Sequence, residues 1–288
     1  MAGQVGLSVT LLVLAGLLFQ SLRNALDRDP GFDMAGSAIA EIAVSTKKYD
    51  GSVGRANAYN EMLRGIEVIP GVVSAGLVSL PPLGGANNVS DISAVGEAEV
   101  RLLERPFANF RWASPGYFAA MGIPVLKGRV FDDVRSTPPP VVISEGAARA
   151  LWPGREPIGR ELTGRAGEPL RVVAVVPDAL VETLESESSL MVYQPHWYDY
   201  APADLWLVVR SQLDPLSHAG SIRGVVHGID PEVPIGAFQP AKSLVDRTIA
   251  TRVFASTTIG LFSMLALVLT QAHSFVDVWD ACRSRSLV

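Results

Sequence analysis

Two long apolar stretches, one near each end of the chain, frame a middle region of mixed hydrophobic and polar pattern. The first, residues 1–22, has no charged side chain and is rich in leucine and valine. As a helix it would measure about 33 Å, enough to cross a hydrocarbon core of about 30 Å. The second, residues 253–276, carries no charge apart from His273, although serine and threonine dilute its apolar character. The pattern therefore predicts transmembrane helices over residues 1–26 and 253–276.

Two other interpretations of the first stretch are a cleaved signal peptide and a helix buried in a soluble core. A signal peptide has a Lys or Arg before its apolar run and a small-residue cleavage site after it. The sequence has neither feature. A core helix seldom runs for so long without a charge, so an uncleaved membrane helix is the favoured interpretation.

The orientation of the two predicted helices is left open by the charges. Arg283 and Arg285 follow the second stretch. By the positive-inside tendency they place a tail, residues 277–288, in the cytoplasm and residues 27–252 outside the membrane. Two arginines directly after the first stretch would then lie on the outer side and oppose this orientation.

The middle region alternates strand-like and helix-like patterns. Strands are expected at residues 38–44, 72–80, 107–113, 141–143, 170–176, 205–210 and 234–238. Helices are expected at residues 55–69, 115–121, 145–152 and 214–229. Ser114 and Ser144 stand at N-cap positions, and residues 81–105 read as a loop rich in turn-forming residues. Short strands interleaved with helices predict an α+β or α/β domain.

Composition excludes several classes of protein. The 288 residues are 48% hydrophobic and 18% charged, which is too apolar for a disordered chain. Cys282 is the single cysteine, so the chain has neither an intrachain disulfide nor a CxxC zinc site. A net charge of −5 argues against nucleic acid as the partner, because phosphate binding needs a basic face.

A search for catalytic motifs returns nothing. The chain lacks the GxxxxGK[ST] phosphate loop, the GxSxG nucleophile motif and the HExxH zinc motif. We therefore predict that it is not an enzyme, and we assign no catalytic, cofactor-binding or metal-binding residue.

Weaker candidates each have a structural explanation that we favour. The four histidines, His196, His218, His227 and His273, share no ligand spacing. The pair 132–133 could bind a cation, but a loop or capping role is favoured, and the glutamates between 182 and 187 read as a solvated loop. The aromatic residues at 196–206 could form a binding surface, but packing between subdomains is favoured. Residues 88–90 match the glycosylation pattern, which has meaning only in a host with that machinery.

Several segments together resemble one known family. They are QVGLSVTLLVLAGLLFQSLRNALDRDPGFD, SPGYFAAMGIPVLKGRVFDD, PVVISEGAARALWPGREPIGREL, LRVVAVVPDA, LWLVVRSQLDP and GIDPEVPIGAF. In this order they are similar to bacterial ABC-transporter permeases of the macrolide-exporter and lipoprotein-release type (MacB/FtsX-like). The resemblance covers nearly the whole chain and is closest to acidobacterial-type permeases that carry no fused ATPase.

The resemblance implies an α+β fold with two subdomains, flanked by two transmembrane helices. A ferredoxin-like porter subdomain would comprise residues 37–106 and 203–250. A mixed α/β subdomain, residues 107–202, would be inserted into it. Together they would form a periplasmic core, residues 27–252, of a protein of the bacterial inner membrane.

The resemblance also implies a mechanism and partners. Such permeases bind a separate cytoplasmic ABC ATPase and convert ATP hydrolysis into movement of the periplasmic domain, as in efflux. The partners would be that ATPase, a second copy or another permease chain, and the lipid bilayer.

Members of the family have four membrane helices, whereas the chain has two candidate stretches. We therefore expect a truncated or split permease. The alternative is a membrane-tethered extracytoplasmic binding or sensor module without transport activity.

Overall fold

The computed structural model of the chain describes residues 31–84, 88–97, 101–164, 167–179, 190–198 and 201–244, with a few single positions outside these ranges. The chain divides into two compact units, of which residues 29–245 form one and the two ends form the other. The predicted membrane helices and the tail lie almost entirely outside the described residues. Within the described part of the chain, no helix has the length and apolar character needed to span a membrane.

Twelve strands form one mixed sheet in the described part of residues 29–245. The main path is β12-β1-β11-β2-β5-β10-β7-β9-β8-β4, while β3 pairs with β5 and β6 pairs with β9. The strands are β1 (Ser37–Ala43), β2 (Val72–Val78), β3 (Val89–Asp91), β4 (Ser93–Ala94), β5 (Phe107–Ala113), β6 (Lys127–Gly128), β7 (Pro140–Ser144), β8 (Glu161–Thr163), β9 (Pro169–Val176), β10 (Leu190–Pro195), β11 (Asp204–Ser211) and β12 (Gln239–Pro240). The helices are α2 (Gly51–Glu67), α3 (Gly116–Ala120), α4 (Glu145–Leu151) and α5 (Ala219–Ile229), with 3₁₀ turns η1 (Leu102–Glu104) and η2 (Pro215–His218).

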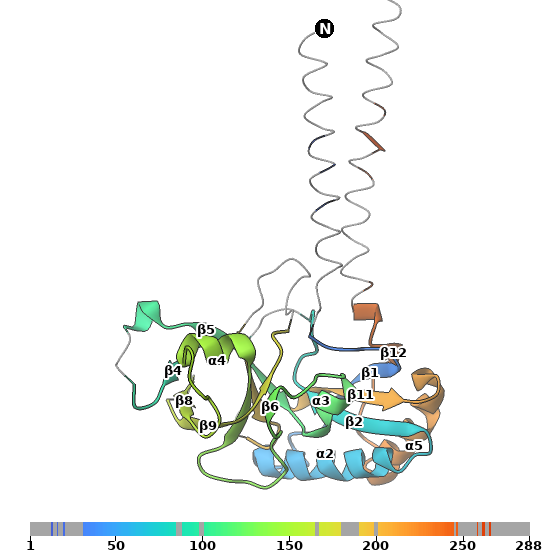
Figure 1. Ribbon diagram of the computed structural model, residues 1–288. Helices are drawn as coiled ribbons and strands as arrows, with labels where there is room; N and C mark the ends of the chain where they lie inside the picture. Colours follow the sequence, from blue (N-terminus) through green and yellow to red (C-terminus); the bar gives the residue numbers. More distant parts are fainter. Residues whose placement is uncertain are drawn as a thin grey trace, which may run out of the picture. The chain divides into compact units, whose positions relative to one another are not determined.

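The first half of the sheet has ferredoxin-like topology. The units β1-α2-β2 and β11-α5-β12 interleave to give the strand order β12-β1-β11-β2, with each neighbouring pair antiparallel. Helices α2 and α5 lie together against one face (Figure 1). Alternation along β11 explains this, because Leu207 and Val209 belong to the core under these helices, whereas Val208 points to the opposite face.

Helix α3 packs on the opposite face through a contact between two glycines. A Cβ atom at Gly76 in β2 would lie 2.2 Å from the backbone N of Tyr117. A Cβ atom at Gly116 would lie 2.0 Å from the carbonyl oxygen of Ala75. Only glycine at both positions allows the two backbones to approach so closely. The contact seats Tyr117 and Phe118 in a second apolar core.

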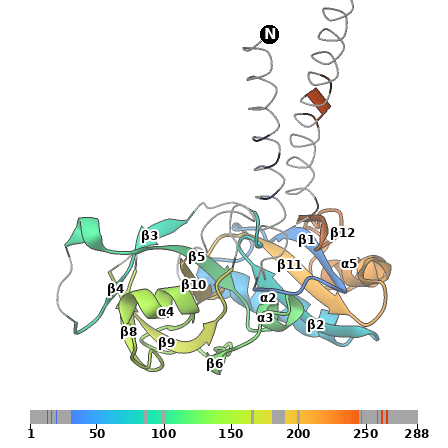
Figure 2. The ribbon, with the colours of Figure 1, turned by 45° about the horizontal axis from the view of Figure 1, so that its top comes forward.

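The second half of the sheet contains both parallel and antiparallel pairs. Strand β10 runs parallel to β5 and β9 runs parallel to β7, while β10 and β7 are antiparallel. Helix α4 packs on β7, β9 and β10. A third core lies here, with Phe110, Ile143 and the fully buried Trp152 among its members. Figure 2 shows β3 beside β5 and β4 near β8 on this side.

The structure confirms the mixed α+β class and most of the predicted strands and helices. It also differs from the predictions at several points. Residues 81–105 contain β3, β4 and η1 in addition to loop. The predicted strand at 234–238 is reduced to a single bridge between Ile42 and Ile235, followed by β12. Strands β6, β8 and β10 were not predicted, and the 214–229 helix splits into η2 and α5.

The N-cap predictions have opposite outcomes. The Ser144 hydroxyl accepts a hydrogen bond from the backbone N of Ala147 at 3.3 Å, as expected of a cap. The prediction for Ser114 is wrong, because its hydroxyl accepts from the backbone N of Leu77 at 2.8 Å. Residue 115 takes the N-cap position of α3 without a side-chain hydrogen bond.

Candidate functional site

The two halves of the sheet meet at a short junction between β2 and β5. Val78 and Ala113 form its single register pair. Next to this pair, the backbone N of Ser114 donates to the carbonyl oxygen of Leu77 at 2.9 Å. The Ser114 hydroxyl accepts a hydrogen bond from the backbone N of Leu77. A junction with so few ladder bonds must be completed by side chains.

Side chains of helix α2 form hydrogen bonds with the segment that joins β10 to β11. Nε2 of His196 lies 2.8 Å from the side-chain oxygen of Asn60. The guanidinium of Arg55 donates to the carbonyl oxygen of Ala201 at 2.9 Å, and the Tyr59 hydroxyl donates to that of Ala203. The side chains of one helix therefore tie the first half to the end of the second.

His196 is a deeply buried titratable group at this junction, with 2% of its surface exposed. Burial lowers its pKa to about 4, and the positive charge of Arg135 acts in the same direction. The guanidinium of Arg135 lies 5.7 Å from the ring centre of the adjacent Trp197. At neutral pH the imidazole is therefore uncharged and serves as a structural hydrogen-bonding group.

An acidic pair lies where α2 approaches the loop between β6 and β7. Partial burial raises the pKa of Glu67, and the negative charge of Asp133 raises it further. Partial burial and the neighbouring Asp132 raise the pKa of Asp133, while Arg64 opposes the shift. Glu67 is also the last residue of α2, where the helix dipole disfavours a negative charge.

Glu67→Gln is therefore expected to stabilise the chain slightly at pH 7, by about 1–2 °C in melting temperature. A raised carboxyl pKa means that the ionised form costs stability in the folded state. This cost is absent below the ordinary glutamate pKa of 4.5, grows as pH rises, and is complete above the raised value. Thermal melts at pH 7 and pH 4 test this. The difference from wild type should disappear at pH 4, and Glu61→Gln, on the same helix, should show none at either pH.

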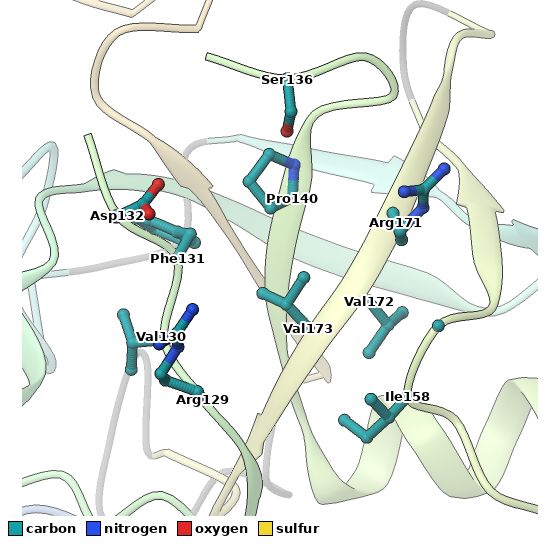
Figure 3. Close-up of a pocket in the computed structure, with 11 residues that line it drawn as sticks. Arg129, Val130, Phe131, Asp132, Ser136, Pro140, Ile158, Arg171, Val172 and Val173 are labelled. Atoms are coloured by element: carbon teal, nitrogen blue, oxygen red, sulfur yellow. The ribbon is translucent and has the colours of Figure 1, made fainter. Parts of the chain in front are cut away.

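A groove opens in the second half, beside β9. Its volume is about 380 Å³, and its walls come from residues 129–132, 136, 140, 158–159 and 171–173. Figure 3 shows Arg129 and Asp132 on one side of the groove and Arg171 on the other. Apolar side chains such as Val173 lie between them. Of the two cavities described for this domain, this is the one with room for a small molecule.

Arg111 is a buried cation that the sequence pattern did not single out. It is 2% exposed, and burial lowers its pKa. It lines a cavity of about 10 Å³ together with the rings of Tyr117 and Tyr193. Burial raises the pKa of Tyr193 to about 12 and that of Tyr117 well above its usual value. Both tyrosines therefore stay neutral, and a space of this size admits at most a single water molecule.

The structure places the remaining sequence candidates apart from one another. His218 bonds to Ser211 and His227 to the carbonyl oxygen of Val233, while His273 lies outside the described residues. Asp132 accepts from the backbone N of the residue at 134, as in an ordinary turn. The glutamates between 182 and 187 lie outside the described residues. Among those described, no three His, Cys, Asp or Glu side chains are grouped to hold a metal ion.

The aromatic segment 196–206 is divided between two cores. Trp197 and Tyr198 are buried in the core of the second half, and Trp206 packs against the core under α3. Tyr200 lies outside the described residues. The described members of the cluster therefore act in packing at the junction.

Comparison with known proteins gives a family match and similar solved structures. A family model for the MacB-like periplasmic core domain matches residues 5–222. The periplasmic region of MacB from Actinobacillus actinomycetemcomitans aligns with a TM-score of 0.46 and 13% identity, over 79% of this chain and 98% of that one. The extracellular domain of the noncanonic ABC-type transporter YknZ from Gram-positive bacteria aligns with a TM-score of 0.42 and 15% identity, over 69% of this chain and 100% of that one. No curated protein matches the chain.

Proposed function

The chain belongs to the family of MacB-like periplasmic core domains, and from this premise we propose that it is the membrane permease component of an ABC-type transporter. A separate cytoplasmic ATPase hydrolyses ATP, and the permease transmits the resulting motion to its extracytoplasmic domain, residues 27–252. The observation that carries the proposal is the extent of the family match, which begins in the first apolar stretch and continues to α5.

The fold supports a mechanical role at the point where the chain enters and leaves the domain. Strands β1 and β12 are antiparallel neighbours, with Ala38 opposite Pro240 and Ile39 opposite Gln239. The backbone N of Ala241 adds a bond of 2.8 Å to the carbonyl oxygen of Ser37. Segments leading from the predicted membrane helices, residues 1–26 and 253–276, therefore attach to adjacent strands. A force applied through both helices acts on one edge of one sheet.

The proposal divides the domain into a porter subdomain, residues 37–106 and 203–250, and an inserted subdomain, residues 107–202. The ferredoxin-like strand order of the first half supports the former. Residues 89–94 pair with β5 and β8, so this short part of the sequence lies with the second half of the sheet. Motion between the subdomains would act on the junction at Ser114 and His196.

The proposal involves no chemistry of the chain's own. We assign no catalytic residue, cofactor or metal, and no nucleic acid partner. The expected partners are the ATPase, a second copy or another permease chain, and the lipid of the inner membrane, with residues 277–288 on the cytoplasmic side.

Labelling with a membrane-impermeant maleimide tests the topology on which this function depends. Ser136 is exposed, so Ser136→Cys in a Cys282→Ser chain should fold normally. We expect this cysteine to react in intact spheroplasts, and the natural Cys282 of the unmodified chain to react only after lysis. Reaction of position 136 only after lysis would contradict the proposed topology.

Affinity purification of the full chain from its own host tests the coupling to an ATPase. We expect a vanadate-sensitive ATPase of the ABC class to be recovered with the chain after crosslinking, and not with a chain that lacks residues 253–288.

A second function, a membrane-tethered binding module, is favoured by one observation, the groove beside β9. Recovery of no ATPase together with saturable ligand binding would support that function instead.

A further inference from the structure

The groove beside β9 has an arginine, Arg129, whose backbone is fixed by a hydrogen bond and whose guanidinium forms no ion pair with the described residues. The backbone N of Arg129 donates to the carbonyl oxygen of Val173 at 3.1 Å, which fixes this residue at the rim. The preceding Gly128 has a φ of 73°, and a Cβ atom there would lie 2.1 Å from the same carbonyl oxygen. The strand contact thus depends on glycine, and it sets the position from which the Arg129 side chain extends.

The guanidinium of Arg129 has no carboxylate partner within 4.0 Å among the described residues. Asp132 lines the same groove, yet its carboxylate accepts a hydrogen bond from the backbone N of Val134 at 3.0 Å. Most described arginines of the second half are paired, as Arg149, Arg155 and Arg160 are. An exposed cation beside a cavity is available for a ligand.

Arg171 brings a second positive charge to the groove. It extends from β9 and lies 3.4 Å from a carboxylate oxygen of Glu161, a long contact, with 47% of its side chain exposed. The lining residues therefore carry two positive charges and one negative charge. This balance favours an anion over a cation.

The wall between the charges is apolar. Ile158, Val172 and Val173 line it together with Pro140 and Phe131. A volume of about 380 Å³ lies in the range of small-molecule sites, about 300–1,000 Å³, and is too small for the two chains of a membrane lipid. The combination of a cationic rim and an apolar wall fits a molecule that has both an anionic head and an apolar body.

We propose that the groove binds a small amphipathic oxyanion, with its head between Arg129 and Arg171 and its apolar body against Ile158. This site is independent of the proposed transport function, because it requires no ATPase and no membrane topology. A permease could use such a site to respond to a molecule outside the membrane, and a tethered binding module would use it directly.

Isothermal titration of the full chain with 1-naphthyl phosphate tests the proposal, with detergent blanks subtracted. We expect saturable one-to-one binding, and at least about tenfold weaker binding of inorganic phosphate or 1-naphthol, because each supplies half of the recognition. Arg129→Gln should weaken binding about tenfold, the scale of one charge-assisted hydrogen bond. Ser136→Trp, which places a large side chain at the exposed rim, should abolish it.

Arg101→Gln is the matched control, because Arg101 is 84% exposed and pairs with Glu104 away from the groove. It should bind as wild type does. Melting temperatures of all three variants verify folding. Absence of saturable binding by wild type, or equal losses in Arg129→Gln and Arg101→Gln, would overturn the proposal, as would unchanged binding by folded Ser136→Trp.

Discussion

Gly76→Ala is expected to lower the melting temperature of the chain by roughly 6–12 °C, which corresponds to about 3 kcal/mol. The added methyl group would lie 2.2 Å from the backbone N of Tyr117 and 2.4 Å from its Cα. Backbone atoms cannot rotate away as a flexible side chain can, so α3 would have to lift from β2. The buried aromatic rings of Tyr117 and Phe118 would move with it, because they anchor the core on that face of the sheet.

Thermal melts followed by circular dichroism measure this effect, and Gly224→Ala is the matched control. A Cβ atom at Gly224, in the middle of α5, would meet nothing within 4 Å. Alanine there should stabilise the helix by up to about 1 kcal/mol through its higher helix propensity. A Gly76→Ala protein that melts with wild type would show that α3 is not held against β2.

Acid is expected to destabilise the chain by about 3 kcal/mol through His196, as pH falls from 7 to below 4. The unfolded imidazole binds a proton near its ordinary pKa of 6.5, whereas burial lowers the pKa in the folded protein to about 4. The unfolded state therefore gains protons first. Stability is complete above pH 6.5, declines below it, and reaches its full loss once the pH is below 4.

Urea denaturation of wild type and of His196→Gln at pH 7 and pH 4 measures this contribution. Glutamine can still meet Asn60 but cannot be protonated, so the variant should lose about 3 kcal/mol less than wild type between the two pH values. His227→Gln is the control, because it removes a histidine from the same domain without touching the junction. A variant with the same pH dependence as wild type would exclude His196 as the acid-sensitive group.

Local signals in the sequence predicted the elements whose stabilising contacts are local. The cap at Ser144 is an example, because its hydroxyl reaches the backbone only three residues ahead. Ser114 occupies a similar place in the sequence, yet its hydroxyl bonds to Leu77, 37 residues away. Strand β10 was not predicted for the same reason. Its neighbours, β5 and β7, both lie far from it in the sequence.

The groove could not be predicted, because its lining comes from several segments that are separate in the sequence. Arg129 and Arg171 are 42 positions apart, and the sequence gives no sign that both flank one cavity. The burial of Arg111 could not be predicted either, because the alternating pattern of its strand does not distinguish it from its aromatic neighbours. The family, in contrast, was visible in the sequence, since its segments occur in order along the chain.

The position of the second half within the chain has a consequence for how such domains diversify. That half departs after β2 and returns at β11, and these two strands are antiparallel partners, with Val78 opposite Trp206. A simple hairpin turn would therefore suffice to join the strands if everything between them were absent. The four strands β12-β1-β11-β2 can keep their register whatever segment connects β2 to β11. Evolution can therefore replace the inserted half while the four-stranded sheet stays the same.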